Sequence, residues 1–194
     1  PFGHESRGDG RVEQLRVPPQ SVEAEQAVLG GLMLAPDAYD RIADLLVPND
    51  FYRRDHQLIY SAICDLAEKN QPFDAVTLGE WFESHGKSGE IGGGAYLVEL
   101  SSTTGSAANI RAYAEIVRDK AVLRRLIEVG TGIVNDAFMP EGRATKEVLS
   151  KAEQDVLAIA EDGARGRMDF VAVNDAMKEA FDVLQTRFAS GGSI

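Results

Sequence analysis

Cysteine and histidine are scarce in this chain of 194 residues. The single cysteine, Cys64, excludes an internal disulfide and any zinc site built on cysteines. It lies in an apolar run with no histidine or basic residue beside it in helical register, which favours a small buried hydrophobe over a reactive thiol. The three histidines, His4, His56 and His85, are far apart and have no partners at ligand spacing. We therefore expect no metal site.

Long apolar runs and basic residues are also few. No stretch approaches the roughly 20 apolar residues of a membrane helix, and the first residues carry no hydrophobic secretory core. We expect a cytoplasmic protein without a membrane partner, and its start at Pro1 suggests that the natural beginning is missing. Twenty Lys and Arg against 31 Asp and Glu give a formal net charge of −11. That charge disfavours sequence-independent DNA binding by this chain and favours a basic protein partner.

No combination of residues suggests catalysis. Gly86-Lys87-Ser88 resembles the end of a phosphate-binding loop, but Trp81 stands where that motif requires its first glycine. No nucleophile is found with a base and charge-stabilising donors. We predict no catalytic residue, no bound cofactor and no metal ligand in this chain.

Apolar residues recur at helical spacing along most of the chain, and we predict an all-α fold. Residues 1–17 are polar and aperiodic and are expected to form a disordered tail. Residues 18–104 are predicted to form a compact subdomain of five short helices. Their predicted starts are Ser21 as an N-cap, Pro36 (ending at Leu46), Asp55, Thr77 in a capping box with Glu80, and the glycines 92–94.

Residues 105–162 are predicted to form a long helical hairpin, with a helix over about 107–138, a short turn, and a second helix over about 144–161. Two apolar stripes cover about half of the first helix, more than one antiparallel helix can bury. One stripe contains Val122, Leu126, Val129, Ile133 and Ala137. We predict self-association or docking of another protein on the other stripe and the second helix, through Ile116, Leu123, Ile127, Val134, Phe138 and Val156.

Beyond the hairpin we predict a flexible linker over 163–170, an amphipathic linker helix over 171–189, and a tail over 190–194. A helix this short is marginal alone in water, so packing must stabilise it. It could fold back on its own domain, but the linker favours docking on another chain or an absent domain. Its predicted docking residues are Val173, Met177, Phe181, Leu184 and Phe188.

Several segments resemble, in order and at the family's spacing, the N-terminal region of bacterial replicative DNA helicases of the DnaB family. They are VPPQSVEAEQAVLGGLML (17–34), FYRRDHQLIY (51–60), DAVTL (74–78), GGAYL (93–97), SAANIRAYA (106–114) and IVRDK (116–120). The resemblance covers about residues 17–189. It implies a helical subdomain, a hairpin and a linker helix joined to an ATPase domain that this chain lacks.

The resemblance implies a non-catalytic collar module that assembles subunits and recruits primase at the replication fork. ATP-dependent DNA unwinding, with ATP and Mg²⁺ as cofactors, would belong to the missing ATPase domain. Further implied features are pairing of these domains within a hexamer, docking of the linker helix on a neighbouring subunit, a helicase loader as partner, and contact with DNA only through the full ring. The implied location is the bacterial nucleoid at replication forks.

Two other interpretations remain open at this point. One is a stand-alone helical adaptor or regulator derived from such a domain, without an attached helicase. The other is direct DNA binding through basic residues near the hairpin, which we interpret as a solvated helix face rather than a phosphate-binding patch. These residues are Arg111, Arg118, Lys120, Arg124 and Arg125.

Overall fold

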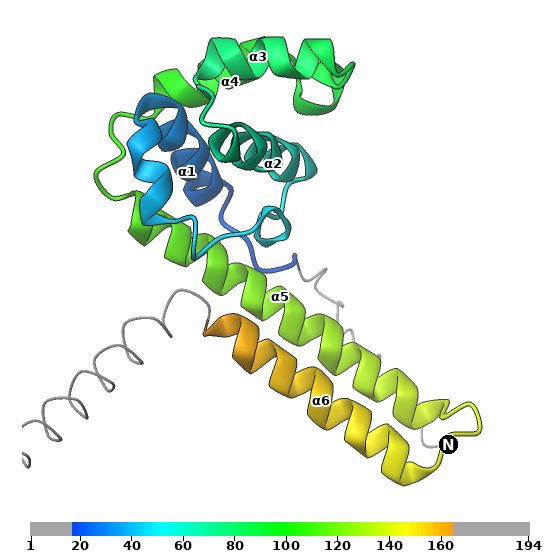
Figure 1. Cartoon of the computed structure of the whole chain (residues 1–194). Coiled ribbons are helices and arrows are strands. Elements are labelled where there is room, and N and C mark those ends of the chain that lie inside the picture. The colour runs from blue at the N-terminus through cyan, green and yellow to red at the C-terminus, as the bar shows by residue number, and fades with distance from the viewer. Residues whose placement is uncertain (1–16, 165–194) are drawn as a thin grey trace, which may run out of the picture.

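The computed structural model describes residues 17–164, and every regular element within this range is a helix (Figure 1). The α-helices are α1 (Val22–Leu34), α2 (Arg54–Glu68), α3 (Ala75–Ser84), α4 (Gly94–Thr103), α5 (Ile110–Phe138) and α6 (Thr145–Gly163). Three short 3₁₀ helices join them: η1 (Pro36–Arg41), η2 (Pro48–Asp50) and η3 (Ser88–Ile91). The predicted all-α class is confirmed. The predicted N-terminal tail, apart from residue 17, and the linker, linker helix and C-terminal tail from residue 165 onward lie outside the described residues.

Helices α1 to α4 enclose one apolar core at one end of the molecule (Figure 1). Helix α1 and the end of α4 approach each other closely at Gly30 of α1. A Cβ atom there would lie 2.0 Å from Oγ1 of Thr104 and 2.3 Å from the main-chain oxygen of Leu100. Only glycine permits α1 and the end of α4 to pack this closely. The neighbouring Gly31 faces Ile110, so the same crossing fixes the start of α5.

Helix α5 belongs to both parts of the molecule. Its first two turns supply Ile110, Ala114 and Val117 to the core. The rest extends away from the subdomain, and α6 runs antiparallel beside it to form the hairpin (Figure 1). Along the described part of this seam, Val129 and Ile159 are the buried apolar side chains beyond the core, each 8% exposed. The hairpin therefore has a thin apolar interior.

Two local predictions of the start of a helix are confirmed. The Ser21 hydroxyl accepts a hydrogen bond from the amide of Ala24, as an N-cap does. The glycine-rich segment leads directly into α4, and Gly92 and Gly93 adopt φ values of 78° and 77°, which glycine accommodates without a steric penalty. No helix within 17–164 is long and apolar enough to cross a bilayer.

The predicted second helix, from Pro36 to Leu46, is wrong in type and length. The chain instead forms η1 and then a series of turns after Arg41. Ile42 leaves helical geometry with φ −135° and ψ −5°, and its side chain is fully buried. Burial of Ile42 and Leu46 in the subdomain core overrides the local helical pattern, a common outcome for short segments.

The predicted capping box of Thr77 with Glu80 is also wrong. Helix α3 begins three residues earlier, and Asp74 is its N-cap, with one carboxylate oxygen accepting from the amides of Val76 and Thr77 at 2.9 and 3.1 Å. The Thr77 hydroxyl instead donates to the main-chain oxygen of Asp74. An aspartate three residues before a threonine competes for the same role and wins because its carboxylate is the stronger acceptor.

Candidate protein-docking site

The predicted stripe along α5 is exposed to solvent over the whole length of the hairpin. Its side chains range from 41% exposed at Ile116 to 82% at Phe138. Of the sixteen large apolar side chains that are exposed in the described chain, ten belong to the hairpin. Such a concentration is unusual for a monomer surface and typical of a protein interface.

Helix geometry explains why the two predicted stripes have different environments. At about 100° per residue, Val129 lies roughly 160° around α5 from Ile127 and roughly 140° from Val134. Val129 packs in the seam with α6 and is buried, whereas Val134 is 53% exposed. Helix α6 thus covers the apolar side chains along one edge of the apolar surface of α5 and leaves those along the other edge exposed to solvent. Leu126, from the second stripe, is itself 50% exposed.

Helix α6 extends this surface across the seam. Val156 borders a shallow hollow of about 480 Å³ together with Ile133 of α5 and Leu157 of α6. We name the combined surface the apolar hairpin face. It comprises Ile116, Leu123, Leu126, Ile127, Ile133, Val134 and Phe138 of α5 with Leu149, Val156 and Leu157 of α6. All six predicted hairpin residues are exposed to solvent, and their role in docking stays a prediction.

The hairpin also carries several ion pairs. Arg125, half a turn around α5 from the stripe, pairs with Glu128 at 2.9 Å. Asp136 accepts from both Arg143 (2.8 Å) and Lys151 (3.1 Å), and these hydrogen bonds lower the pKa of its carboxyl group. Exposed ion pairs of this kind contribute little to stability. The pairs of Asp136 join α5 to α6 and to the turn between them, whereas the pair of Arg125 with Glu128 lies on α5 alone.

Four of the five basic residues near the hairpin are held by acceptors within the protein: Arg125, paired with Glu128, and Arg111, Arg118 and Arg124. The Arg118 side chain is only 4% exposed and pairs with Asp50 and Asp162. Arg124 donates to the main-chain oxygens of Pro19 and Asp50 at 2.7 and 2.6 Å, and burial lowers its pKa. Arg111 donates to the main-chain oxygen of Arg41.

For Arg118 and Arg124, these contacts correct the interpretation of the basic residues as a solvated helix face. Arg118 and Arg124 are internal cations that join the hairpin to the subdomain, because their guanidinium groups bind acceptors in and beside η2. The same contacts give no support to a phosphate-binding patch, since a phosphate would have to displace existing acceptors.

The structure also contains a buried polar cluster that sequence reasoning missed. Glu25 lies in the first turn of α1, yet it is 1% exposed and lies against His56, which is fully buried. The signal was available: His56 precedes Ile59, Tyr60 and Ile63 at spacings of three, four and seven, on the core side of α2. Within residues 17–164, no group of three or more potential ligands could hold a metal ion.

Cys64 is half-buried rather than fully buried. Burial raises the pKa of its thiol, and the nearby Tyr39 hydroxyl forms a hydrogen bond that acts in the opposite direction. A protonated thiol is a poor nucleophile, and the unreactive role of Cys64 stays a prediction.

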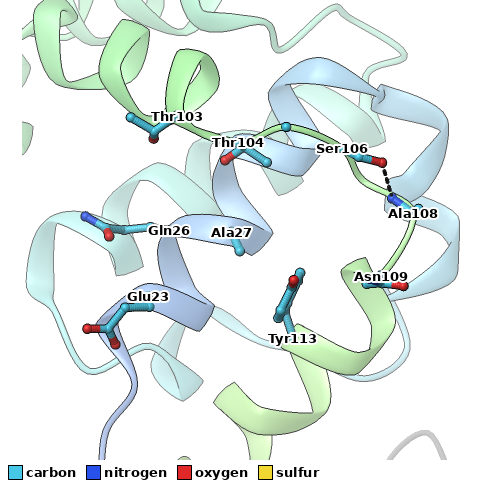
Figure 2. Close-up of a pocket in the computed structure, with 10 residues that line it drawn as sticks. Glu23, Gln26, Ala27, Thr103, Thr104, Ser106, Ala108, Asn109 and Tyr113 are labelled. Carbon is cyan, nitrogen blue, oxygen red and sulfur yellow. Dashed lines mark hydrogen bonds between the residues drawn. The ribbon is translucent and has the colours of Figure 1, made fainter.

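A second hollow, of about 520 Å³, lies between α1 and the segment that joins α4 to α5 (Figure 2). Glu23 and Gln26 line it from α1, and Tyr113 lines it from α5 (Figure 2). The Ser106 hydroxyl at its rim accepts from the amide of Ala108 at 3.0 Å. The lining offers hydroxyl and amide groups with a single carboxylate, which suits hydrogen bonding rather than catalysis.

Residues 17–119 match the family described as the DnaB-like helicase N terminal domain. The chain belongs to this family. The replicative DNA helicase DnaB of Haemophilus influenzae is 43% identical over 179 residues, which are 91% of this chain and 38% of that protein. The DnaB protein of Pasteurella multocida is 42% identical over 150 residues, which are 77% of this chain and 32% of that protein. The chain thus spans less than two fifths of the length of these curated DnaB relatives.

Solved structures of DnaB proteins show the same fold. The N-terminal domain of DnaB helicase from Mycobacterium tuberculosis is similar with a TM-score of 0.71 at 43% identity, covering 73% of this chain and 99% of that one. A DnaB-like replicative helicase described together with its interactions with primase gives a TM-score of 0.60 at 22% identity, covering 81% of this chain and 35% of that one. The resemblance of the sequence segments to the DnaB family is confirmed.

Proposed function

We propose that this chain is the N-terminal collar module of a replicative DNA helicase and that its apolar hairpin face joins subunits. The observation that carries the proposal is the exposure of ten large apolar side chains on the hairpin, although α5 and α6 already pack together. Burying one such side chain contributes about 1.5–3 kcal/mol. A handful of them therefore supports a stable contact between subunits.

The shape of this face suits a second copy of the same hairpin. The stripe runs straight along α5, whose 29 residues offer an extended line of contact to another helix. A two-fold contact places the same patch on both partners, so one apolar face is sufficient to form it. Paired modules of this kind would form the collar of a hexamer in the full-length protein.

Primase is the second proposed partner, on or beside the paired hairpins. Two observations support it: a DnaB-like helicase of the same fold is described with its interactions with primase, and the net charge of −11 favours a basic partner surface. A helicase loader is a further proposed partner of the assembled ring.

We assign enzymatic activity to the full-length protein rather than to this module. ATP and Mg²⁺ would bind in an ATPase domain beyond this chain, DNA would be contacted through the complete ring, and the protein would act at replication forks in the bacterial nucleoid. The predicted linker helix over 171–189 lies outside the described residues, and we propose that it docks on a neighbouring subunit's ATPase domain.

Binding of purified primase to the 194-residue chain tests this proposal. Ile127→Glu places a charge in the centre of the apolar hairpin face, and we expect it to weaken primase capture strongly, either directly or by separating paired hairpins. Val98→Glu is the matched control, because Val98 is similarly exposed (54% against 56%) but belongs to α4. Equal capture by the two variants, or no capture by the wild-type chain, would contradict the proposal.

A further inference from the structure

The side chain of Arg118 bridges two parts of the molecule that are distant in sequence. Its Nη1 lies 2.7 Å from Oδ1 of Asp50 in η2, and its Nη2 lies 2.9 Å from Oδ2 of Asp162 in the last turn of α6. Nη2 also donates to the main-chain oxygen of Asp162. We propose that Arg118 is a coupling residue: displacement of the end of α6 loosens segment 47–53 of the subdomain, and the reverse.

Because the bridge is buried, a change at one of its two carboxylates affects the other through Arg118. The side chains of Arg118 and Asp50 are 4% and 6% exposed, whereas that of Asp162 is 42% exposed. Nε of Arg118 is buried and has no hydrogen-bond partner among residues 17–164, so the guanidinium depends on its Nη contacts. A buried cation that loses one of two carboxylates is poorly compensated and must shift or become hydrated. That shift would act directly on Asp50.

Asp50 passes such a movement to the rest of segment 47–53. Its Oδ2 accepts from the amide of Val47 at 2.9 Å, and its main-chain oxygen accepts from Arg124 at 2.6 Å. Two residues further along, the amide of Tyr52 donates to the buried carboxylate of Glu25 at 2.6 Å. Side chains from α1 and α5 thus hold the segment together. The hydrogen exchange of its amides therefore depends on the position of Asp50.

The end of α6 is also where the chain leaves the hairpin towards residues 165–194. Helix α6 packs mainly on α5, and near its end Gly163 lies against Val122. The bridge through Arg118 therefore ties this exit point to the subdomain. Coupling between two sites is reciprocal, so a displacement of the end of α6 affects segment 47–53, and a displacement of that segment affects the end of α6. This inference rests on the described contacts alone and holds whether or not the proposed collar function is correct.

Hydrogen–deuterium exchange of the 194-residue chain tests the coupling. Asp162→Ala removes the exposed carboxylate of the bridge and leaves only the main-chain oxygen of residue 162 as an acceptor at that end. We expect exchange over 47–53 to accelerate by about fivefold or more, with a similar change in the last turn of α6. Asp155→Ala is the matched control, because it removes an acid from the same helix that pairs with Lys151 at 2.8 Å. We expect this control to leave 47–53 at wild-type protection.

The buried strip 59–66 of α2 serves as an internal reference in both variants. If exchange in Asp162→Ala accelerated only in α6, the proposal would be overturned, because Arg118 would then stabilise only the end of that helix. Equal acceleration in 47–53 and 59–66 would overturn it as well, since that pattern indicates global unfolding. The reciprocal variant, Asp50→Asn, is expected to accelerate exchange over 159–164, and wild-type protection there would also contradict the coupling.

Discussion

Oε2 of Glu25 lies 2.6 Å from Nδ1 of His56, and both side chains are almost completely removed from solvent. Nε2 of His56 lies 2.7 Å from the Tyr96 hydroxyl, so the cluster joins α1, α2 and α4. Oε1 of Glu25 is satisfied by the amide of Tyr52. A buried polar network whose members are all paired fixes one arrangement of the surrounding helices, because any other arrangement leaves polar groups unpaired.

Glu25→Ala is therefore expected to destabilise the subdomain by about 3 kcal/mol or more, since it leaves His56 and the Tyr52 amide without their acceptor. Denaturant unfolding of the 194-residue chain measures the change. Glu23→Ala is the control, because Glu23 is exposed on the same helix and its loss should change the free energy of unfolding by no more than about 0.5 kcal/mol. Similar losses in both variants would show that the buried cluster has no special role.

Gly30 of α1 tests the close crossing of α1 and α4, and Gly79 of α3 serves as its control. Gly30→Ala would place a Cβ 2.3 Å from the main-chain oxygen of Leu100, and we expect a loss of about 3 kcal/mol as the helices move apart. Gly79→Ala meets nothing within 4 Å and should raise stability by about 0.5–1 kcal/mol, because alanine favours the helix. Unfolding curves of the two variants should shift in opposite directions. A neutral Gly30→Ala would contradict the close crossing.

The cap of α3 should make stability depend on pH. Burial raises the pKa of Asp74, but hydrogen bonds from the amides of Thr77 and Val76 outweigh it and hold the pKa below the usual 3.8. A carboxyl whose pKa is lower in the folded state than in the unfolded state stabilises the fold when the pH is above its unfolded-state pKa. That contribution is lost as the pH falls through its folded-state pKa. Asp74→Ala should cost about 1 kcal/mol at neutral pH.

That cost should shrink once the wild-type carboxyl is protonated, below its folded pKa. Denaturant unfolding of wild type and Asp74→Ala over a pH series from neutral into the acid range measures the difference. A difference that stays constant across the series would mean that the carboxylate charge does not contribute to the cap.

Local signals in the sequence predicted much of the fold. Ser21 and the glycines 92–94 act within a few residues, and their roles were predicted correctly. Ile42 and Asp74 show where this reasoning ends: the burial of Ile42 depends on the whole subdomain, and two neighbouring polar residues, Asp74 and Thr77, competed for one cap. Tertiary packing decided the first case, and acceptor strength decided the second.

Some features of the candidate site could likewise be predicted from the sequence, and others could not. The stripe through Ile127 and Val134 follows from helical periodicity alone, because its exposure requires only that one partner helix is too narrow to cover it. The contacts of Arg118 could not be predicted, since they bring together residues 50, 118 and 162. The pairing of Glu25 with His56 likewise depends on how α1 crosses α2. Such contacts need the fold before they can be inferred.

The linker-helix proposal predicts a separation between folding and assembly. Phe181→Ala combined with Leu184→Ala should leave the melting temperature of the 194-residue chain nearly unchanged, and it should weaken ring assembly of the full-length protein. Thermal unfolding of the chain and native mass spectrometry of the full-length helicase measure the two effects. A large drop in the melting temperature of the chain would instead mean that these side chains pack on their own domain.

The most direct test of the account is the molar mass of this chain in solution, measured by size-exclusion chromatography with light scattering over a series of concentrations. The wild-type chain is predicted to associate as its concentration rises. Leu123→Glu combined with Ile127→Glu should remain monomeric, whereas the control pair Val76→Glu with Val98→Glu, exposed outside the hairpin, should associate as wild type does. A wild-type chain that stays monomeric at every concentration would contradict the claim that the apolar hairpin face joins subunits.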